Sequence, residues 1–137
     1  IDPPYESADE YTQLIEHMKL AVKRWSIGTY AVWYPLLSPQ RVDHKSGNIV
    51  SNPKAKLSHS MLKALTDLPV KSILNVYFSP SGPSSELGMY GSGMCILNPP
   101  WQLAEELEVL LRELVDHLCL EPNEHCGVDW LKTEGQS

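Results

Sequence analysis

Residues 29–34 constrain the fold more than any other part of the 137-residue chain. They form a run of β-branched and aromatic residues, Thr-Tyr-Ala-Val-Trp-Tyr, that Pro35 closes. Such a run, without polar alternation, is typical of a strand covered on both faces of a sheet. Before it, apolar residues recur at helical intervals over about residues 8–25, behind a capping-box spacing at residues 7–10, and Gly28 ends this helix. A helix followed by a strand of this kind is half of a parallel crossover unit, which predicts an α/β fold.

The rest of the chain continues the alternation of helices and strands. Residues 36–52 are expected to be a polar connection, after which Asn52 and Pro53 cap and start a helix. The further elements expected from the apolar patterns are a helix carrying Leu57 to Leu68, strands at 72–78 and 93–97, a helix from near Trp101 to Leu118, and a short strand at 128–131.

The loop expected over residues 79–91 is rich in Gly, Pro and Ser and is a candidate lid. No helix lies between the strands that it joins, so we expect them to be antiparallel neighbours. A sheet with helices on both faces also needs strands before residue 1. We therefore interpret the chain as the C-terminal half of a doubly wound, mostly parallel sheet with an antiparallel strand.

The charge balance limits how nucleic acid can bind. The formal net charge of −6 argues against a surface that is basic throughout, because phosphate binding requires clustered Lys and Arg. A small local basic rim is compatible with this charge, and the residues that could form it are Arg41, Lys45, Lys54 and Lys56. No apolar run approaches the roughly 20 residues of a membrane span. We expect no membrane association.

Cysteine usage indicates reduced thiols in a cytoplasmic protein. Cys95, Cys119 and Cys126 are odd in number and are not spaced as a disulfide framework. His117, Cys119, His125 and Cys126 are all of ligand type, but their His-x-Cys and His-Cys pairs match no common zinc spacing. We predict no metal site.

The tetrapeptide Asp2-Pro3-Pro4-Tyr5 is the strongest candidate for chemistry. At the carboxyl end of a strand, the carboxylate of Asp2 can accept a hydrogen bond from an exocyclic amino group, and the carbonyl of Pro3 can accept the second hydrogen. The nitrogen lone pair then points out of the base plane toward an electrophilic methyl group. Tyr5 offers a ring on which a planar base stacks. The alternative is an Asp-Pro-Pro turn that only precedes a helix, with Tyr5 packed against that helix.

A second motif, Asn98-Pro99-Pro100-Trp101, resembles the first but is expected to be structural. Asn98 would end a strand and cap a helix, the prolines would set its first turn, and Trp101 would pack. Trp33 and Tyr34 are candidates for the wall of a base pocket, with core packing as the alternative.

Four blocks in this order resemble the bacterial 23S ribosomal RNA adenine-N6 methyltransferases of the methyltransferase J family. They are residues 2–6 (Asp-Pro-Pro-Tyr-Glu), 28–35 (Gly-Thr-Tyr-Ala-Val-Trp-Tyr-Pro), 91–101 (Gly-Ser-Gly-Met-Cys-Ile-Leu-Asn-Pro-Pro-Trp) and 128–131 (Val-Asp-Trp-Leu). The resemblance implies a Rossmann-like methyltransferase that uses S-adenosyl-L-methionine (SAM) as methyl donor and ribosomal RNA as substrate. It further implies that residues 1–137 are the C-terminal part of a single catalytic domain, and that the cofactor-binding N-terminal half, which the activity requires, is absent from this chain.

The resemblance also implies roles for individual residues. Asp2 matches the catalytic aspartate, which lies close to the cofactor. Asp2, Pro3 and Tyr5 form the catalytic set, and Pro4 and Tyr5 bind the substrate. The function expected is methyl transfer to the N6 amine of an adenine in 23S ribosomal RNA. A DNA adenine-N6 methyltransferase, a cytosine-N4 methyltransferase and a non-catalytic RNA-binding module that retains the fold are the alternatives.

Overall fold

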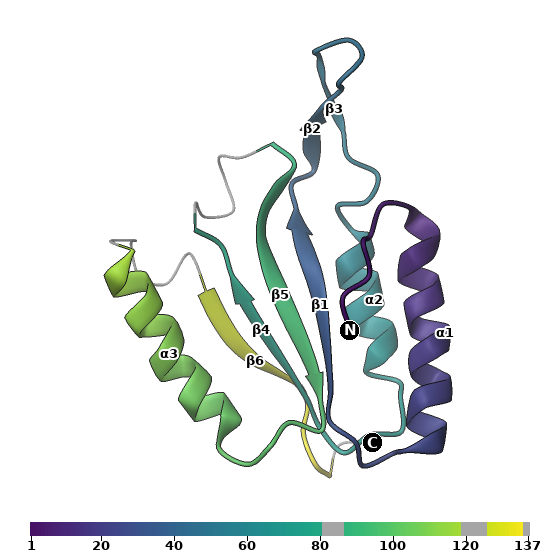
Figure 1. Ribbon diagram of the computed structural model, residues 1–137, viewed down its shortest axis with the longest axis vertical. Helices are drawn as coiled ribbons and strands as arrows, with labels where there is room; N and C mark the ends of the chain where they lie inside the picture. Colours follow the sequence, from purple (N-terminus) through teal and green to yellow (C-terminus); the bar gives the residue numbers. More distant parts are fainter. Residues whose placement is uncertain (81–86, 119–125, 136–137) are drawn as a thin grey trace.

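A four-stranded sheet with helices on both faces is the frame of the chain in the computed structural model (Figure 1). The structure describes residues 1–80, 87–118 and 126–135. In chain order the elements are α1 (Ala8–Arg24), β1 (Tyr30–Leu37), β2 (Gln40–Val42), β3 (Ile49–Ser51), α2 (Leu57–Leu65), β4 (Ile73–Phe78), β5 (Met89–Leu97), α3 (Leu103–His117) and β6 (Cys126–Lys132).

The strand order in the sheet is β1-β5-β4-β6, and each neighbouring pair is antiparallel. The expectation of a mostly parallel sheet is therefore not met by the described strands. The inference of a strand–helix–strand crossover was partly right, because β1 and β4 run in the same direction and α2 connects them. β5 lies between these two strands and pairs with each of them in the antiparallel direction, so β1 and β4 do not pair with each other. The prediction that β4 and β5 are antiparallel neighbours is confirmed.

The helices cover the sheet unequally. α1 and α2 lie on one face and α3 on the other (Figure 1). The larger core joins α1 and α2 to inward residues of the strands, among them Val32, Tyr34 and Cys95. The smaller core packs Ala104 of α3 against Leu74 and Ile96. The strand β1, buried at Val32 and Tyr34, is an apolar strand as predicted, and it continues through Pro35 to Leu37.

The helix predicted over residues 8–25 is confirmed as α1. The carboxylate of Glu10 accepts a hydrogen bond from the backbone N–H of Ser7 at 3.1 Å, as the capping-box spacing indicates. The start of α2 differs from the prediction. The side chain of Asn52 accepts a hydrogen bond from the N–H of Lys54 at 3.2 Å in a turn that precedes the helix, so Asn52 caps that turn and α2 begins only at Leu57.

Two predicted loops contain strands. The connection at residues 36–52 holds the hairpin of β2 and β3, which projects beyond one end of the sheet (Figure 1). The residues from Met89 onward, expected to belong to a loop, pair with β1 as the start of β5. β2 and β3 have three residues each, too few for a visible apolar alternation, and the first residues of β5 include glycine and serine, so the sequence pattern missed these parts. The remainder of the candidate lid, residues 81–86, lies outside the described residues.

Ile1 extends the sheet on the far side of β1. Its amino group donates to the carbonyl of Ala31 at 2.8 Å, and its carbonyl accepts from the N–H of Trp33 at 3.0 Å. One residue bonded to the two neighbours of Val32 in this way is the hydrogen-bond pattern of a parallel pair. Ile1 therefore lies beside β1 with the same direction as β1.

The motif at Asn98 is structural, as predicted, but by a different route. The Asn98 side chain donates to the carbonyls of Ser26 and Gly28 at 2.9 and 3.0 Å and accepts from the N–H of Lys71, so it joins three segments. It does not cap α3, whose N-cap residue is Gln102. The prediction that Trp101 packs was wrong, since its side chain is 88% exposed.

Candidate functional site

The turn that carries Asp2 leaves the sheet directly after Ile1, next to β1. The side chain of Asp2 is exposed and forms no hydrogen bond with any residue that the structure describes. Within the same residues, no N–H donates to the carbonyl of Pro3. The carboxylate and this carbonyl are therefore both available as acceptors for a ligand, as the chemistry inferred for the tetrapeptide requires.

Tyr5 packs against the helix that follows the turn, as the alternative interpretation of the tetrapeptide expected. Its side chain is only 4% exposed, and its ring packs against Tyr11 and Trp33 at centroid distances of 4.6 and 6.0 Å. The hydroxyl donates to the carbonyl of Trp33 at 2.5 Å, and burial raises the pKa of this phenol well above its usual range. The backbone of Tyr5 has a φ of 53°, which is unusual for a residue other than glycine. In this conformation neither face of the ring is open to a base.

Beside this turn is a cleft with a volume of about 370 Å³, named here the motif cleft. Pro4, Tyr5 and Trp33 form its apolar and aromatic part. Trp33 is half-buried, packs against the core and lines this cleft, and its predicted role in the wall of a base pocket stays a prediction. Tyr34, on the opposite face of β1, is instead 1% exposed and belongs to the core.

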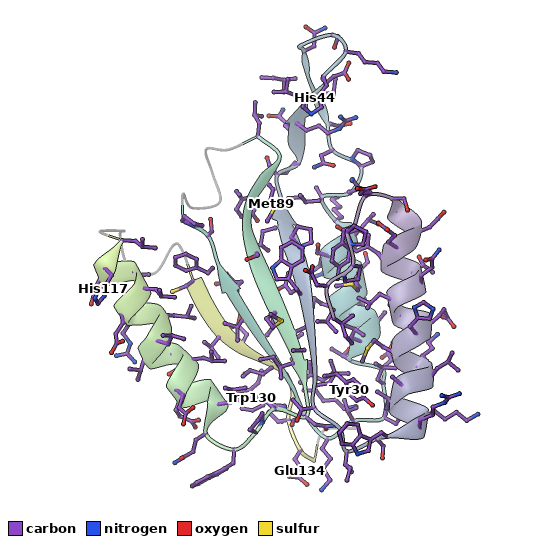
Figure 2. All side chains as sticks on the ribbon, in the orientation of Figure 1. Tyr30, His44, Met89, His117, Trp130 and Glu134 are labelled. Atoms are coloured by element: carbon purple, nitrogen blue, oxygen red, sulfur yellow. The ribbon has the colours of Figure 1, made fainter. Side chains whose placement is uncertain are left out.

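Positive charge gathers at the other side of the motif cleft. Arg41 and His44 come from the β2–β3 hairpin and Lys54 from the turn before α2. Two of the four residues expected to form a basic rim therefore border this cleft, whereas Lys45 and Lys56 are not among its lining residues. Figure 2 shows His44 on the hairpin beyond the start of β5, where Met89 also borders the cleft.

Lys54 fixes the turn as well as lining the cleft. Its ammonium group donates to the carbonyls of Tyr5 at 3.3 Å and Glu6 at 3.0 Å. These charge-assisted hydrogen bonds join the turn after Ile1 to the segment before α2. They satisfy the backbone carbonyl of the residue that has the positive φ. Nothing in the sequence pattern pairs Lys54 with residues so far away.

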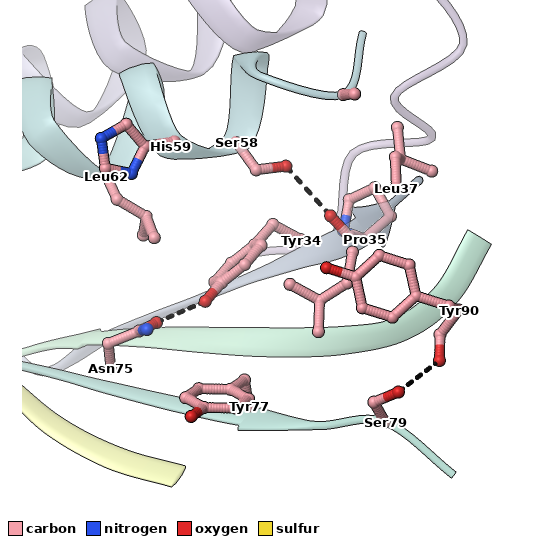
Figure 3. A pocket seen from close by; sticks show the side chains of 12 residues that line it. Tyr34, Pro35, Leu37, Ser58, His59, Leu62, Asn75, Tyr77, Ser79 and Tyr90 are labelled. Carbon is pink, nitrogen blue, oxygen red and sulfur yellow. Dashed lines mark hydrogen bonds between the residues drawn. The ribbon is translucent and has the colours of Figure 1, made fainter. Parts of the chain in front are cut away.

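A second hollow of about 400 Å³ lies on the other side of the end of β1, and we name it the tyrosine pocket (Figure 3). Its walls include Tyr34, Tyr77 and Tyr90 from three strands and His59 from α2. The sequence analysis did not identify it. The sequence shows tyrosines and glycines in several strands, but these residues can be placed beside one another only when the strand register is known.

The candidate metal ligands are only partly visible. Cys119 and His125 lie outside the described residues, and the residues that the structure does describe contain no cluster of His, Cys, Asp or Glu suited to a metal ion. Cys95 is a free, buried thiol, and burial raises its pKa to about 12. Among the described helices, none has the length and apolarity needed to cross a membrane.

Comparisons with known proteins identify the family. Residues 1–132 match the family described as "Ribosomal RNA large subunit methyltransferase D, RlmJ". The chain is 30% identical over 134 residues to the ribosomal RNA large subunit methyltransferase J of Haemophilus influenzae, and 28% identical to that of Escherichia coli. In both cases the match covers 98% of this chain and 42% of the relative.

A solved structure has a similar fold. The crystal structure of a Legionella pneumophila protein of the family DUF519 superposes with a TM-score of 0.69 at 24% identity, covering 99% of this chain and 43% of that one. The chain thus spans less than half the length of the proteins that it matches. By the match over residues 1–132, it belongs to the RlmJ family of ribosomal RNA large subunit methyltransferases.

Proposed function

We propose that the complete protein transfers a methyl group from SAM to the N6 amine of an adenine in 23S ribosomal RNA. The observation that carries this proposal is the position of Asp2. It directly follows Ile1, which pairs in parallel with β1 beside Val32, so its carboxylate comes at the carboxyl end of that short segment, and open α/β sheets bind ligands at the carboxyl ends of strands. The unused acceptor groups of Asp2 and Pro3 and the adjacent motif cleft support the same site.

The chemistry follows from these acceptors. The carboxylate of Asp2 accepts one hydrogen of the adenine amine and the carbonyl of Pro3 accepts the other, which turns the nitrogen lone pair out of the base plane. SAM, when bound, supplies the electrophilic methyl group. The carboxylate also stabilises the positive charge that develops on the amine and accepts the proton that the methylated amine releases. No base is needed before the attack.

In the motif cleft, Pro4, Tyr5 and Trp33 contact the target base. Trp33 has ring surface free in the observed conformation, whereas the Tyr5 ring must turn out of the core before it can stack. Base stacking on an aromatic ring contributes about 1–3 kcal/mol to binding. Arg41 and His44 contact the phosphates on either side of the base.

Most of the cofactor site belongs to a part of the protein that precedes this chain. Asp2 is the one residue here that we assign to contact with SAM, and a single carboxylate cannot hold a cofactor of that size. The 42% coverage of the relatives and the parallel pairing of Ile1 support a preceding half whose last strand runs beside β1. The complete domain is then Rossmann-like, with a mostly parallel sheet, and cytoplasmic, where the ribosomal RNA is made.

Labelled-methyl transfer by the complete protein tests this function. We expect label from SAM to enter 23S ribosomal RNA stripped of protein and to be recovered, after digestion, as N6-methyladenosine. Transfer to adenine in DNA but not RNA would favour the DNA methyltransferase. Binding of RNA without SAM binding by calorimetry would favour a non-catalytic module.

A further inference from the structure

The floor of the tyrosine pocket is built from a row of residues that alternates across the sheet. Tyr34 of β1 pairs with Gly93 of β5, Gly93 pairs with Tyr77 of β4, and Tyr77 pairs with Gly127 of β6. Neighbouring positions in such a row lie on the same face of a sheet. The row Tyr34–Gly93–Tyr77–Gly127 therefore alternates large rings with residues that have no side chain.

Both glycines make room for a ring. A Cβ atom at Gly93 would overlap the Tyr34 ring, and one at Gly127 would lie 2.5 Å from Tyr77 Cε1. Each tyrosine thus lies over the backbone of the next strand instead of standing away from the sheet. Glycine inside a strand weakens it and often marks a close approach of other groups. Here that approach produces an aromatic floor.

A fixed polar group borders this floor. The hydroxyl of Tyr34 donates to Oδ1 of Asn75 at 2.6 Å, and because burial raises the pKa of Tyr34 the phenol stays protonated and remains the donor (Figure 3). This bond orients the amide. Nδ2 of Asn75 donates to no residue in the described part of the chain and is not sealed from solvent. Asn75 lines the pocket and is 8% exposed, so its amide can donate to a ligand there.

The tyrosine pocket adjoins the motif cleft. Pro35 and Leu37 line both hollows, so only the end of β1 separates them. A base taken out of its stack for methylation leaves its neighbours in the same strand without a stacking partner. Proteins commonly bind such bases on aromatic rings and by hydrogen bonds to their edges.

We infer that the tyrosine pocket binds a second nucleobase, that of a nucleotide next to the target adenine in the same RNA strand. The base stacks on the rings of Tyr77 and Tyr90, and the amide of Asn75 donates to an acceptor on its edge. This inference rests on the proposed function. If the pocket binds this base, the nucleotide beside the adenine helps to determine which adenines are substrates.

An oligoribonucleotide containing the methylated adenine, once that position is mapped, provides the test. One flanking nucleotide at a time is replaced by an abasic one, and the dissociation constant for the complete protein is measured by fluorescence anisotropy. Removing the base that occupies the pocket should weaken binding by roughly 5- to 150-fold, which corresponds to about 1–3 kcal/mol. Tyr77→Ala should weaken binding of the intact RNA by a similar factor and should not weaken binding of that abasic RNA further.

Two variants serve as controls. Tyr77→Phe retains the ring and should retain the dependence on the flanking base, whereas Trp101→Ala, at the opposite end of the sheet, should leave it unchanged. Should Tyr77→Ala not fold, Tyr90→Ala gives the same comparison. If the complete protein methylates the RNA but no abasic position is coupled to the tyrosine variants, the inference is wrong and the proposed function stands. Failure of the intact RNA to be methylated would overturn both.

Discussion

At the scale of residues, the turn at Asp2 is positioned by groups distant in the sequence. Lys54 donates to the carbonyls of Tyr5 and Glu6, and the hydroxyl of Tyr5 donates to the carbonyl of Trp33. The backbone of Tyr5, at a φ of 53°, is held by both sets of bonds. Strained backbone of this kind costs about 1–3 kcal/mol and persists where surrounding contacts fix it.

The first prediction concerns Lys54. Lys54→Met should lower the rate of methyl transfer at saturating RNA by roughly tenfold or more, because the turn loses two charge-assisted hydrogen bonds. Lys54→Arg should recover part of that rate. If the ammonium instead served only to bind phosphate, Lys54→Met would raise the KM for RNA and leave kcat unchanged, and this split of the two constants would contradict the positioning role.

Tyr5 gives a second prediction. Tyr5→Phe removes one hydrogen bond and should lower the free energy of unfolding by about 1 kcal/mol, whereas Tyr5→Ala also opens a cavity and should lower it by about 3–5 kcal/mol. Urea unfolding of the complete protein measures both values. In single-turnover methyl transfer, Tyr5→Phe should be far milder than Tyr5→Ala, since the ring binds the base. An equal loss of rate in Tyr5→Phe and Tyr5→Ala would indicate a role for the hydroxyl.

The sequence was sufficient to propose Asp2 and Pro3 as site residues, because the chemistry inferred for them is local to four consecutive residues, and their role stays a prediction. Packing of Tyr5 against the following helix was one of two interpretations, and the sequence alone could not decide between them. The burial of Tyr5 depends on Tyr11, Trp33 and Met61, which the fold brings around the ring. The same holds for Lys54, which reaches the turn only because α2 packs beside α1.

At the scale of elements, the strand register decides which residues of different strands lie side by side. The strands β1, β4, β5 and β6 each contribute one residue to the row of tyrosines and glycines. Each of these strands could be predicted at least in part from its apolar pattern. Their order could not, since β5 enters between β1 and β4 through pairing that no local pattern encodes.

A third prediction tests this row. Gly93→Ala should lower the free energy of unfolding by about 1–3 kcal/mol, because the added methyl group forces the buried ring of Tyr34 away from its position. Ser92→Ala, at the adjacent position on the opposite face of β5, is the matched control and should change stability by no more than about 0.5 kcal/mol. Similar effects of the two substitutions, measured by urea unfolding, would show that Tyr34 does not lie over Gly93.

At the scale of the whole molecule, β1 lies at one edge of the four-stranded sheet. Ile1 already pairs there in the parallel direction, and a hollow of about 330 Å³ between Ile1, Pro3 and the α1 residues His17 and Met18 lies beside it. An apolar strand with an unpaired edge is prone to aggregation. A preceding strand would cover this edge.

The fourth prediction follows from that edge. Residues 1–137 expressed alone should show neither a cooperative urea transition nor SAM binding by calorimetry, whereas the complete protein should show both. Supplying the preceding half in trans should restore them in part. A cooperative transition together with micromolar SAM binding by the isolated chain would mean that its folding and its cofactor site do not depend on a preceding half.

The role of Asp2 is tested most directly by its removal from the complete protein. In single-turnover assays at saturating RNA, with N6-methyladenosine quantified by mass spectrometry after digestion, Asp2→Ala should lower the rate by at least about 10²–10³-fold. Its urea midpoint should not change, because the carboxylate is exposed and makes no hydrogen bond within the described residues. Glu6→Ala, which removes another exposed carboxylate four residues away, should keep the wild-type rate. A rate for Asp2→Ala within a few-fold of wild type would contradict the assignment of this turn to the chemistry.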